Sequence, residues 1–227
     1  MTEQEWISCT DPNLMLDHLC GRRVYNRKLR LFACACCRSI WDVLKDERSR
    51  AAVELAERFA DRKANRWELE RAIAAAFDAI NDGLDGIRDV PLEERDPNLD
   101  IQINVADAAW RTASLASIHE SVQSILGRTS LGKNPSLTHV LLFRDIFGRP
   151  YPFHQTKVES AWLTWGNGTL PRMAQRIYDD RAFDNLPSVA NALEQAGCAN
   201  AEILTHCRQP GPHVRGCWVV DLILGKE

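Results

Sequence analysis

The sequence has no long hydrophobic run, and no stretch approaches the roughly 18 consecutive apolar residues that a membrane-spanning helix needs. Its first residues, Met-Thr-Glu-Gln-Glu-Trp, lack the basic stretch and the apolar run of a secretory signal. The net charge of −3 gives no general attraction to nucleic acid or to anionic lipid. These absences predict a cytoplasmic protein whose partner is another protein rather than nucleic acid or a membrane; they leave its oligomeric state open.

Common catalytic motifs are missing as well. His119-Glu120 is not followed by the second histidine of a zinc-protease helix, and the chain has neither a nucleophile-elbow pentapeptide nor a phosphate-binding glycine loop. The sequence therefore predicts no catalytic residue and no organic cofactor, which favours a protein that is not an enzyme.

What the sequence does contain is helical periodicity. Apolar residues recur every three or four positions from Lys28 to Leu44, as in a helix buried on more than one side. Asp46 and Asn65 stand where N-caps of two further helices are expected. A long alanine-rich helix is predicted from Leu99 to Leu126, and shorter helices over residues 137–147, 171–179, 186–196 and 199–207. The closing apolar run from Cys217 fits helix or strand by periodicity, and its helical neighbours favour helix.

Glycine, proline and acidic residues interrupt this pattern near residues 83–99, and residues 148–169 are loop-like. The predicted fold is all-α, a compact multi-helix bundle with irregular loops in these two places. A length of 227 residues fits a single domain over 1–227, in which helical halves 1–82 and 100–227 pack together.

Cysteines supply the clearest chemical signal. Six of the eight fall into two islands, near the start and near the end of the chain: Cys34, Cys36, Cys37, Cys198, Cys207 and Cys217. In a reducing cytoplasm these are buried small side chains, metal ligands or redox groups rather than disulfides.

A zinc site that joins the two islands is the sharpest hypothesis. Cys34 and Cys37 lie one helical turn apart, so both thiolates can point the same way. Either Cys207 or His206, together with His213 and Cys217, could complete a tetrahedron. The alternative, which packing preference favours, is that the cysteines are core residues, since free cysteine packs as a small hydrophobe.

A reactive thiol is a second reading of the same residues. Cys207 lies beside His206 and close to Arg208 and Arg215, and basic neighbours lower a thiol pKa. Adjacent helical residues face apart, however, so His206 is poorly placed to act as the base for Cys207.

Two basic groups could serve as binding surfaces. The run Arg22, Arg23, Arg27, Lys28 and Arg30, within the segment 22–38, could contact phosphates of nucleic acid, although such a run more often marks a solvated face or pairs with acids. Around the Pro-Gly-Pro turn, a possible interaction patch is formed by Arg208, His213, Arg215 and Trp218. The structural reading of this patch, a turn anchored by its tryptophan, is favoured.

Several motifs resemble those of a large set of paralogous bacterial proteins of no assigned activity. They are Glu5-Trp6 with Cys9-Thr10-Asp11-Pro12, the run from Arg27 to Arg38, Arg144 to Gly148, Leu186-Pro187, and the ending from His206 to Trp218. The resemblance implies kinship and contributes no catalytic residue. The sequence as a whole therefore predicts a non-catalytic helical binding or adaptor module. Its alternatives are a zinc-stabilised or thiol-based protein and weak nucleic-acid binding through the basic segment.

Overall fold

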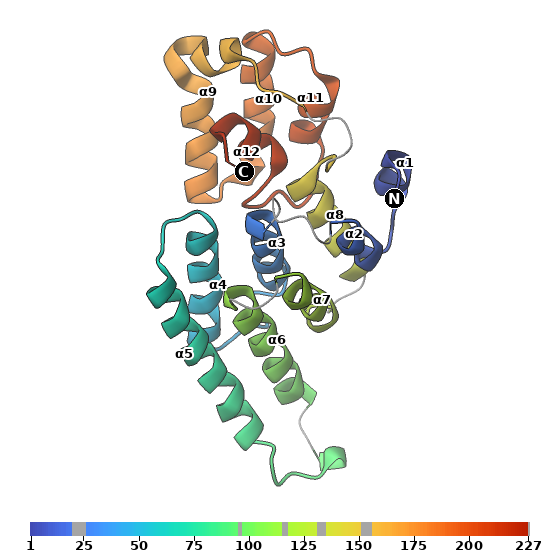
Figure 1. Ribbon diagram of the computed structural model, residues 1–227, viewed down its shortest axis with the longest axis vertical. Coiled ribbons are helices and arrows are strands. Elements are labelled where there is room, and N and C mark those ends of the chain that lie inside the picture. The colour runs from blue at the N-terminus through green and yellow to red at the C-terminus, as the bar shows by residue number, and fades with distance from the viewer. Residues whose placement is uncertain (20–25, 95–96, 115–117, 131–134, 151–155, 227) are drawn as a thin grey trace. The chain divides into compact units, whose positions relative to one another are not determined.

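The computed structural model describes residues 1–19, 26–94, 97–114, 118–130, 135–150 and 156–226 (Figure 1). This part of the chain forms helices and contains no strand, which confirms the all-α class. None of its helices combines the length and the apolarity needed to cross a bilayer. The chain divides into two compact units: a continuous unit, Cys9–Val140, and a discontinuous unit, Met1–Ser8 with Leu141–Glu227.

The continuous unit is built around helix α3. Its elements are α2 (Pro12–Leu19), α3 (Asn26–Ser39), α4 (Glu47–Ala60), α5 (Arg66–Asp85), the 3-10 turn η2 (Leu92–Glu94), α6 (Pro97–Ala113), α7 (Ile118–Arg128) and the first part of α8 (Pro135–Phe147). Helix α3 contacts α4, α6 and α7, while α4, α5 and α6 lie against one another (Figure 1). Three of its cysteines, Cys34, Cys36 and Cys37, are at most 1% exposed, as the core reading predicts.

Both predicted N-caps are present. The Asp46 carboxylate accepts hydrogen bonds from the first backbone N–H groups of α4, at Arg48 and Ser49. Asn65 and Glu68 form a reciprocal capping box at the start of α5. These contacts satisfy donors that have no partner within the helix, so they fix where α4 and α5 begin.

The expected single helix from Leu99 to Leu126 is instead two helices, α6 and α7. Helix α6 ends at Ala113, where the buried Arg30 guanidinium donates to the carbonyls of Thr112 and Ser114. The irregular region expected near 83–99 is also shorter, because α5 continues to Asp85 and α6 begins at Pro97.

The discontinuous unit consists of α1 (Glu3–Ser8), the end of α8, α9 (Ser160–Asp180), the 3-10 turn η3 (Phe183–Asn185), α10 (Leu186–Gln195), α11 (Ala201–Arg208) and α12 (Trp218–Leu224). Helix α10 packs between α9 and α11, and α12 contacts α9 and α11 (Figure 1). Their shared core contains large side chains such as Trp162, Tyr178 and Leu193.

The loop expected over 148–169 is shorter than predicted, because α9 already begins at Ser160. Helix α9 is interrupted at Trp165–Gly168, where Gly166, Asn167 and Gly168 have positive φ. Of the loop expected over 148–169, the structure therefore describes an irregular stretch before α9 and the kink within α9. Residues 151–155 lie outside the described residues.

A buried histidine in the continuous unit predicts acid sensitivity. His139 is 1% exposed, its Nε2 lies 2.9 Å from Thr129 Oγ1, and burial lowers its pKa from 6.5 to about 4. The unfolded chain therefore binds this proton first, so stability is full above pH 6.5 and falls as the pH drops toward 4, by about 3 kcal/mol.

The prediction is tested by urea unfolding at several pH values between 7.5 and 4. In His139→Gln, which keeps an amide donor for Thr129, this component of the pH dependence should be missing. Equal pH dependence in the variant and the unaltered protein would show that His139 does not carry it.

Candidate metal centre

The last turn of α8 places the first residue of the site. Asp145 lies on α8 and is 4% exposed. Helix α8 ends two residues later at Phe147, and Gly148 follows with a φ of +52°. The Gly148 N–H donates to the carbonyl of Arg144, which closes the helix just after the carboxylate.

Helix α11 positions the second residue of the site, His206. The Asn200 side chain caps the start of α11 by accepting from the N–H groups of Glu202 and Ile203. The helix ends at Arg208, so His206 lies in its last turn, and it is 7% exposed.

The turn between α11 and α12 positions the other two residues of the site, His213 and Cys217. After Pro210 the His213 N–H donates to the carbonyl of Gly211, which folds the chain back. Gly216 has a φ of +92°, a conformation that favours glycine. Cys217 follows as the residue before α12 and is fully buried.

These four side chains converge on one point. One ligand atom from each of Asp145, His206, His213 and Cys217 lies within 4.8 Å of all the others. Asp145 Oδ1 is 2.6 Å from His213 Nδ1 and 3.2 Å from His206 Nε2. His206 Nε2 is also 3.2 Å from Cys217 Sγ. Among the described residues, this cluster of a carboxylate, two imidazoles and a thiol could hold a metal ion.

Contacts outside the cluster orient its members. His213 Nε2 lies 3.3 Å from the Gln209 carbonyl, so its proton can be held there and, with a metal bound, Nδ1 would be the ligand nitrogen. The Gln209 side-chain amide lies 3.4 Å from His206 Nδ1, the nitrogen that faces away from the cluster. Asp145 Oδ2 accepts the Val214 N–H at 2.9 Å, so only Oδ1 is directed at the two histidines.

The electrostatics of the site follow from burial and these contacts. Burial by itself raises the pKa of Asp145, but hydrogen bonds from His206 and His213 outweigh it and leave this pKa below its usual value. Burial lowers the pKa of His213, and the Asp145 carboxylate reverses this and leaves it raised. Burial, followed by the charge of Asp145, raises the pKa of the Cys217 thiol well above its usual value. These directions favour an Asp145–His213 ion pair and a protonated Cys217 thiol in the metal-free cluster.

Two residues of the predicted zinc set, His213 and Cys217, belong to this cluster, and the structure favours His206 over Cys207 as a third. Cys207 instead packs in the core of the discontinuous unit, and burial raises its pKa to about 12. The fourth member, Asp145, was not predicted. Its one sequence signal is an acid, next to Arg144, in a helix ending whose other residues are apolar.

The other two predicted ligands, Cys34 and Cys37, lie in the continuous unit, outside the four-residue cluster. Their thiols are buried, and burial raises both pKa values well above the usual range. The sulfur of Cys34 contacts the carbonyl of Val53 at 3.7 Å. Their burial and contacts are typical of cysteines that pack in a protein core.

The basic segment makes intramolecular contacts. Arg27 pairs with Asp61 at 2.8 Å, and Arg38 pairs with the buried Glu57 at 2.7 Å. Arg30 is buried against the end of α6. Arg22 and Arg23 lie outside the described residues. The described arginines of segment 22–38 therefore bind acids and carbonyls of their own unit.

The interaction patch predicted at residues 208–218 is also held by internal contacts. His213 is part of the cluster, and Arg208 Nη1 lies 3.0 Å from Glu194 Oε1. Arg215 donates to the carbonyl of Tyr178 and lies over its ring. The indole of Trp218 lies 5.2 Å from the His206 ring. These contacts support the structural reading of the patch.

Comparisons with protein-family models, with curated proteins and with solved structures each find no match for this chain.

Proposed function

We propose that this protein is a zinc-stabilised helical binding module, in which the ion holds the discontinuous unit together and carries out no reaction. The observation that supports this most is the convergence of Asp145, His206, His213 and Cys217 within 4.8 Å, with all four ligand atoms drawn from one unit. The surface of the folded protein would then bind another protein.

The donor set favours zinc. Imidazole, thiolate and carboxylate all bind Zn²⁺, whereas Mg²⁺ and Ca²⁺ select oxygen ligands. Two neutral histidines, one carboxylate and one thiolate together carry two negative charges, which a divalent ion neutralises. In a buried site this balance matters, because an uncompensated charge there is costly.

A structural role fits the number and burial of the ligands. Structural zinc is held by four protein ligands, while catalytic zinc keeps a position open for water or substrate. Here the protein supplies four donors, three of them on residues less than 9% exposed. The spacing of His206, His213 and Cys217 ties α11 to α12, and Asp145 ties both to α8.

Thiol chemistry has weaker support from the same geometry. In a nucleophile, base and acid relay, the cysteine and the acid contact different nitrogens of the histidine. Here Cys217 and Asp145 both face His206 Nε2. Cys217 is fully buried with a raised pKa, the reverse of a reactive thiol.

The proposal predicts one zinc ion per chain, lost in one cysteine variant and kept in three. Cys217→Ser should bind no zinc at micromolar concentration, since it removes a ligand. Cys207→Ser is the matched control, because Cys207 is equally buried in the same unit but outside the cluster. Cys34→Ser and Cys37→Ser should also keep their zinc.

The measurement is elemental analysis of tag-free protein, followed by zinc titration of chelator-treated protein. Loss of zinc from Cys34→Ser or Cys37→Ser would contradict the four-residue site and favour the site that joins the two cysteine islands. Absence of bound zinc in the unaltered protein, with none taken up on titration, would overturn the proposed function.

A further inference from the structure

Helix α1 belongs to the unit that contains the metal cluster, although the whole continuous unit separates them in the sequence. Trp6 is its anchor, 1% exposed. The indole N–H of Trp6 donates to the carbonyl of Gly148 at 2.8 Å, and its ring meets Phe143 edge to face. Arg144 donates to the carbonyl of Ile7 at 2.6 Å. These contacts fall on both sides of Asp145 in the sequence, at the end of α8 and at the residue that follows it.

A first line of contacts runs from Trp6 to His206. Gly148, whose carbonyl receives the Trp6 indole, lies directly against the ring of Trp218. A Cβ at Gly148 would come within 2.9 Å of that ring, so the two residues are in close contact. Trp218 in turn contacts the metal cluster, since the centre of its ring lies 5.2 Å from that of the His206 ring.

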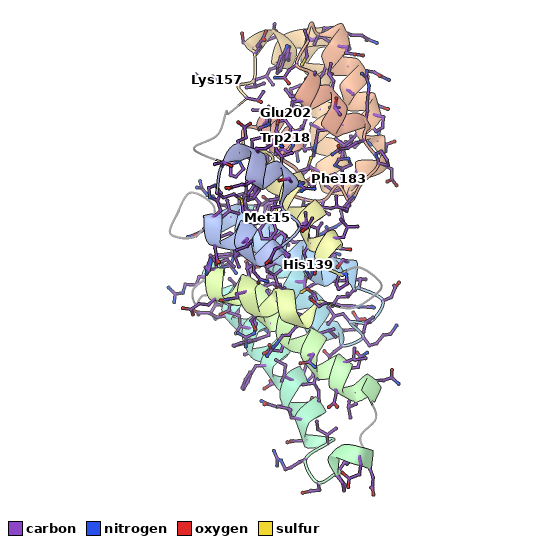
Figure 2. The ribbon with its side chains drawn as sticks, turned by 90° about the vertical axis from the view of Figure 1, so that its right-hand side faces the viewer. Met15, His139, Lys157, Phe183, Glu202 and Trp218 are labelled. Carbon is purple, nitrogen blue, oxygen red and sulfur yellow. The ribbon has the colours of Figure 1, made fainter. Side chains whose placement is uncertain are left out.

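A second line runs through charged groups. Arg149 lies between two carboxylates, 2.7 Å from Glu3 of α1 and 2.9 Å from Glu202 of α11. Glu202 lies one helical turn before His206 on the same helix. Figure 2 labels Glu202 and Trp218, through which the two lines reach the site. Each line begins on α1: the first ends at the His206 ring, and the second ends at Glu202 on α11, the helix that carries His206.

From these contacts we infer that α1 is a positioning clamp for the metal centre, with Trp6 as its main residue. Docked α1 holds the end of α8 and the start of α11, the elements that carry Asp145 and His206. The inference rests on the proposed zinc site, and it adds that the ion and α1 are energetically coupled. Such coupling is reciprocal: if α1 strengthens zinc binding, zinc strengthens the docking of α1 by the same factor.

Trp6→Phe tests the clamp because it keeps one aromatic ring at this buried position and removes the donor to Gly148 together with the second ring of the indole. We expect it to weaken zinc binding by about tenfold, the lower end for residues that support metal ligands. Trp6→Ala should weaken it further. Trp67→Phe is the matched control, since Trp67 is 63% exposed on α5, and its zinc affinity should equal that of the unaltered protein.

The affinities are measured by competition with a chromophoric chelator on the full chain. Hydrogen exchange of the unaltered protein with and without zinc supplies a second readout that requires no variant to fold. Zinc should slow amide exchange in α1, while α5 of the other unit serves as the internal reference.

The outcomes separate the two proposals. One zinc per chain, with equal affinity in Trp6→Phe and the control and with unchanged exchange in α1, would overturn the clamp and leave the zinc site standing. No zinc in the unaltered protein would overturn the zinc site and the clamp with it. Weaker binding in Trp6→Phe together with slower exchange in α1 would support both.

Discussion

Replacement of Asp145 by asparagine should lower the affinity for zinc by at least about a hundredfold. Structural zinc sites bind with about 10–16 kcal/mol, so one ligand of four accounts for about 3 kcal/mol, and each 1.4 kcal/mol is a factor of ten. Asparagine has nearly the same shape, so the change removes charge and ligand strength rather than packing. The Asp145 carboxylate also contacts both histidines and the Val214 N–H.

Zinc affinity is measured by chelator competition, and cobalt substitution reports on the ligand set through its absorption spectrum. Asp180→Asn is a suitable control, because Asp180 is exposed on α9 in the same unit and pairs only loosely with Arg176. Equal zinc affinity in Asp145→Asn and Asp180→Asn would exclude Asp145 as a ligand.

The second large effect concerns the continuous unit. Arg38→Met should destabilise it by about 3 kcal/mol, because the buried Glu57 carboxylate would lose its contact with the Arg38 guanidinium. The Glu57 side chain is 3% exposed, and Arg38 contacts both of its oxygens, at 2.7 and 3.0 Å. Methionine retains much of the apolar stem of the arginine, so the loss falls mainly on the charge contact.

A double-mutant cycle with Glu57→Gln, followed by urea unfolding, isolates this term. The double variant should recover part of the loss, since the group that faces the lost arginine is then neutral. If the two single changes were simply additive, the pair would contribute little, and Arg38 would again be available as a surface charge for a phosphate.

Local sequence rules predicted the helix starts well and one long helix poorly. Asp46 and Asn65 cap their helices through neighbours in the chain, so their role was visible in the sequence. The end of α6 depends on Arg30, which lies 82 residues from Thr112 and binds its carbonyl. No periodicity over residues 99–126 contains that contact, and for this reason the break between α6 and α7 was missed.

The site was predicted in part for a similar reason. His213 and Cys217 were found because histidine and cysteine are frequent zinc ligands and lie close together in the sequence. Asp145 joins them only through the fold, 61 residues before His206. Cys34 and Cys37 have suitable helical spacing, but that spacing also places them in the core of their own unit, where burial raises the pKa values of both thiols.

The most direct test of the zinc centre is X-ray absorption at the zinc edge of the loaded protein, which counts sulfur ligands. The four-residue cluster predicts one sulfur at about 2.3 Å and three nitrogen or oxygen ligands at about 2.0–2.1 Å. Two or more sulfur ligands would contradict this site and would bring a second cysteine, such as Cys34 or Cys37, into the coordination sphere.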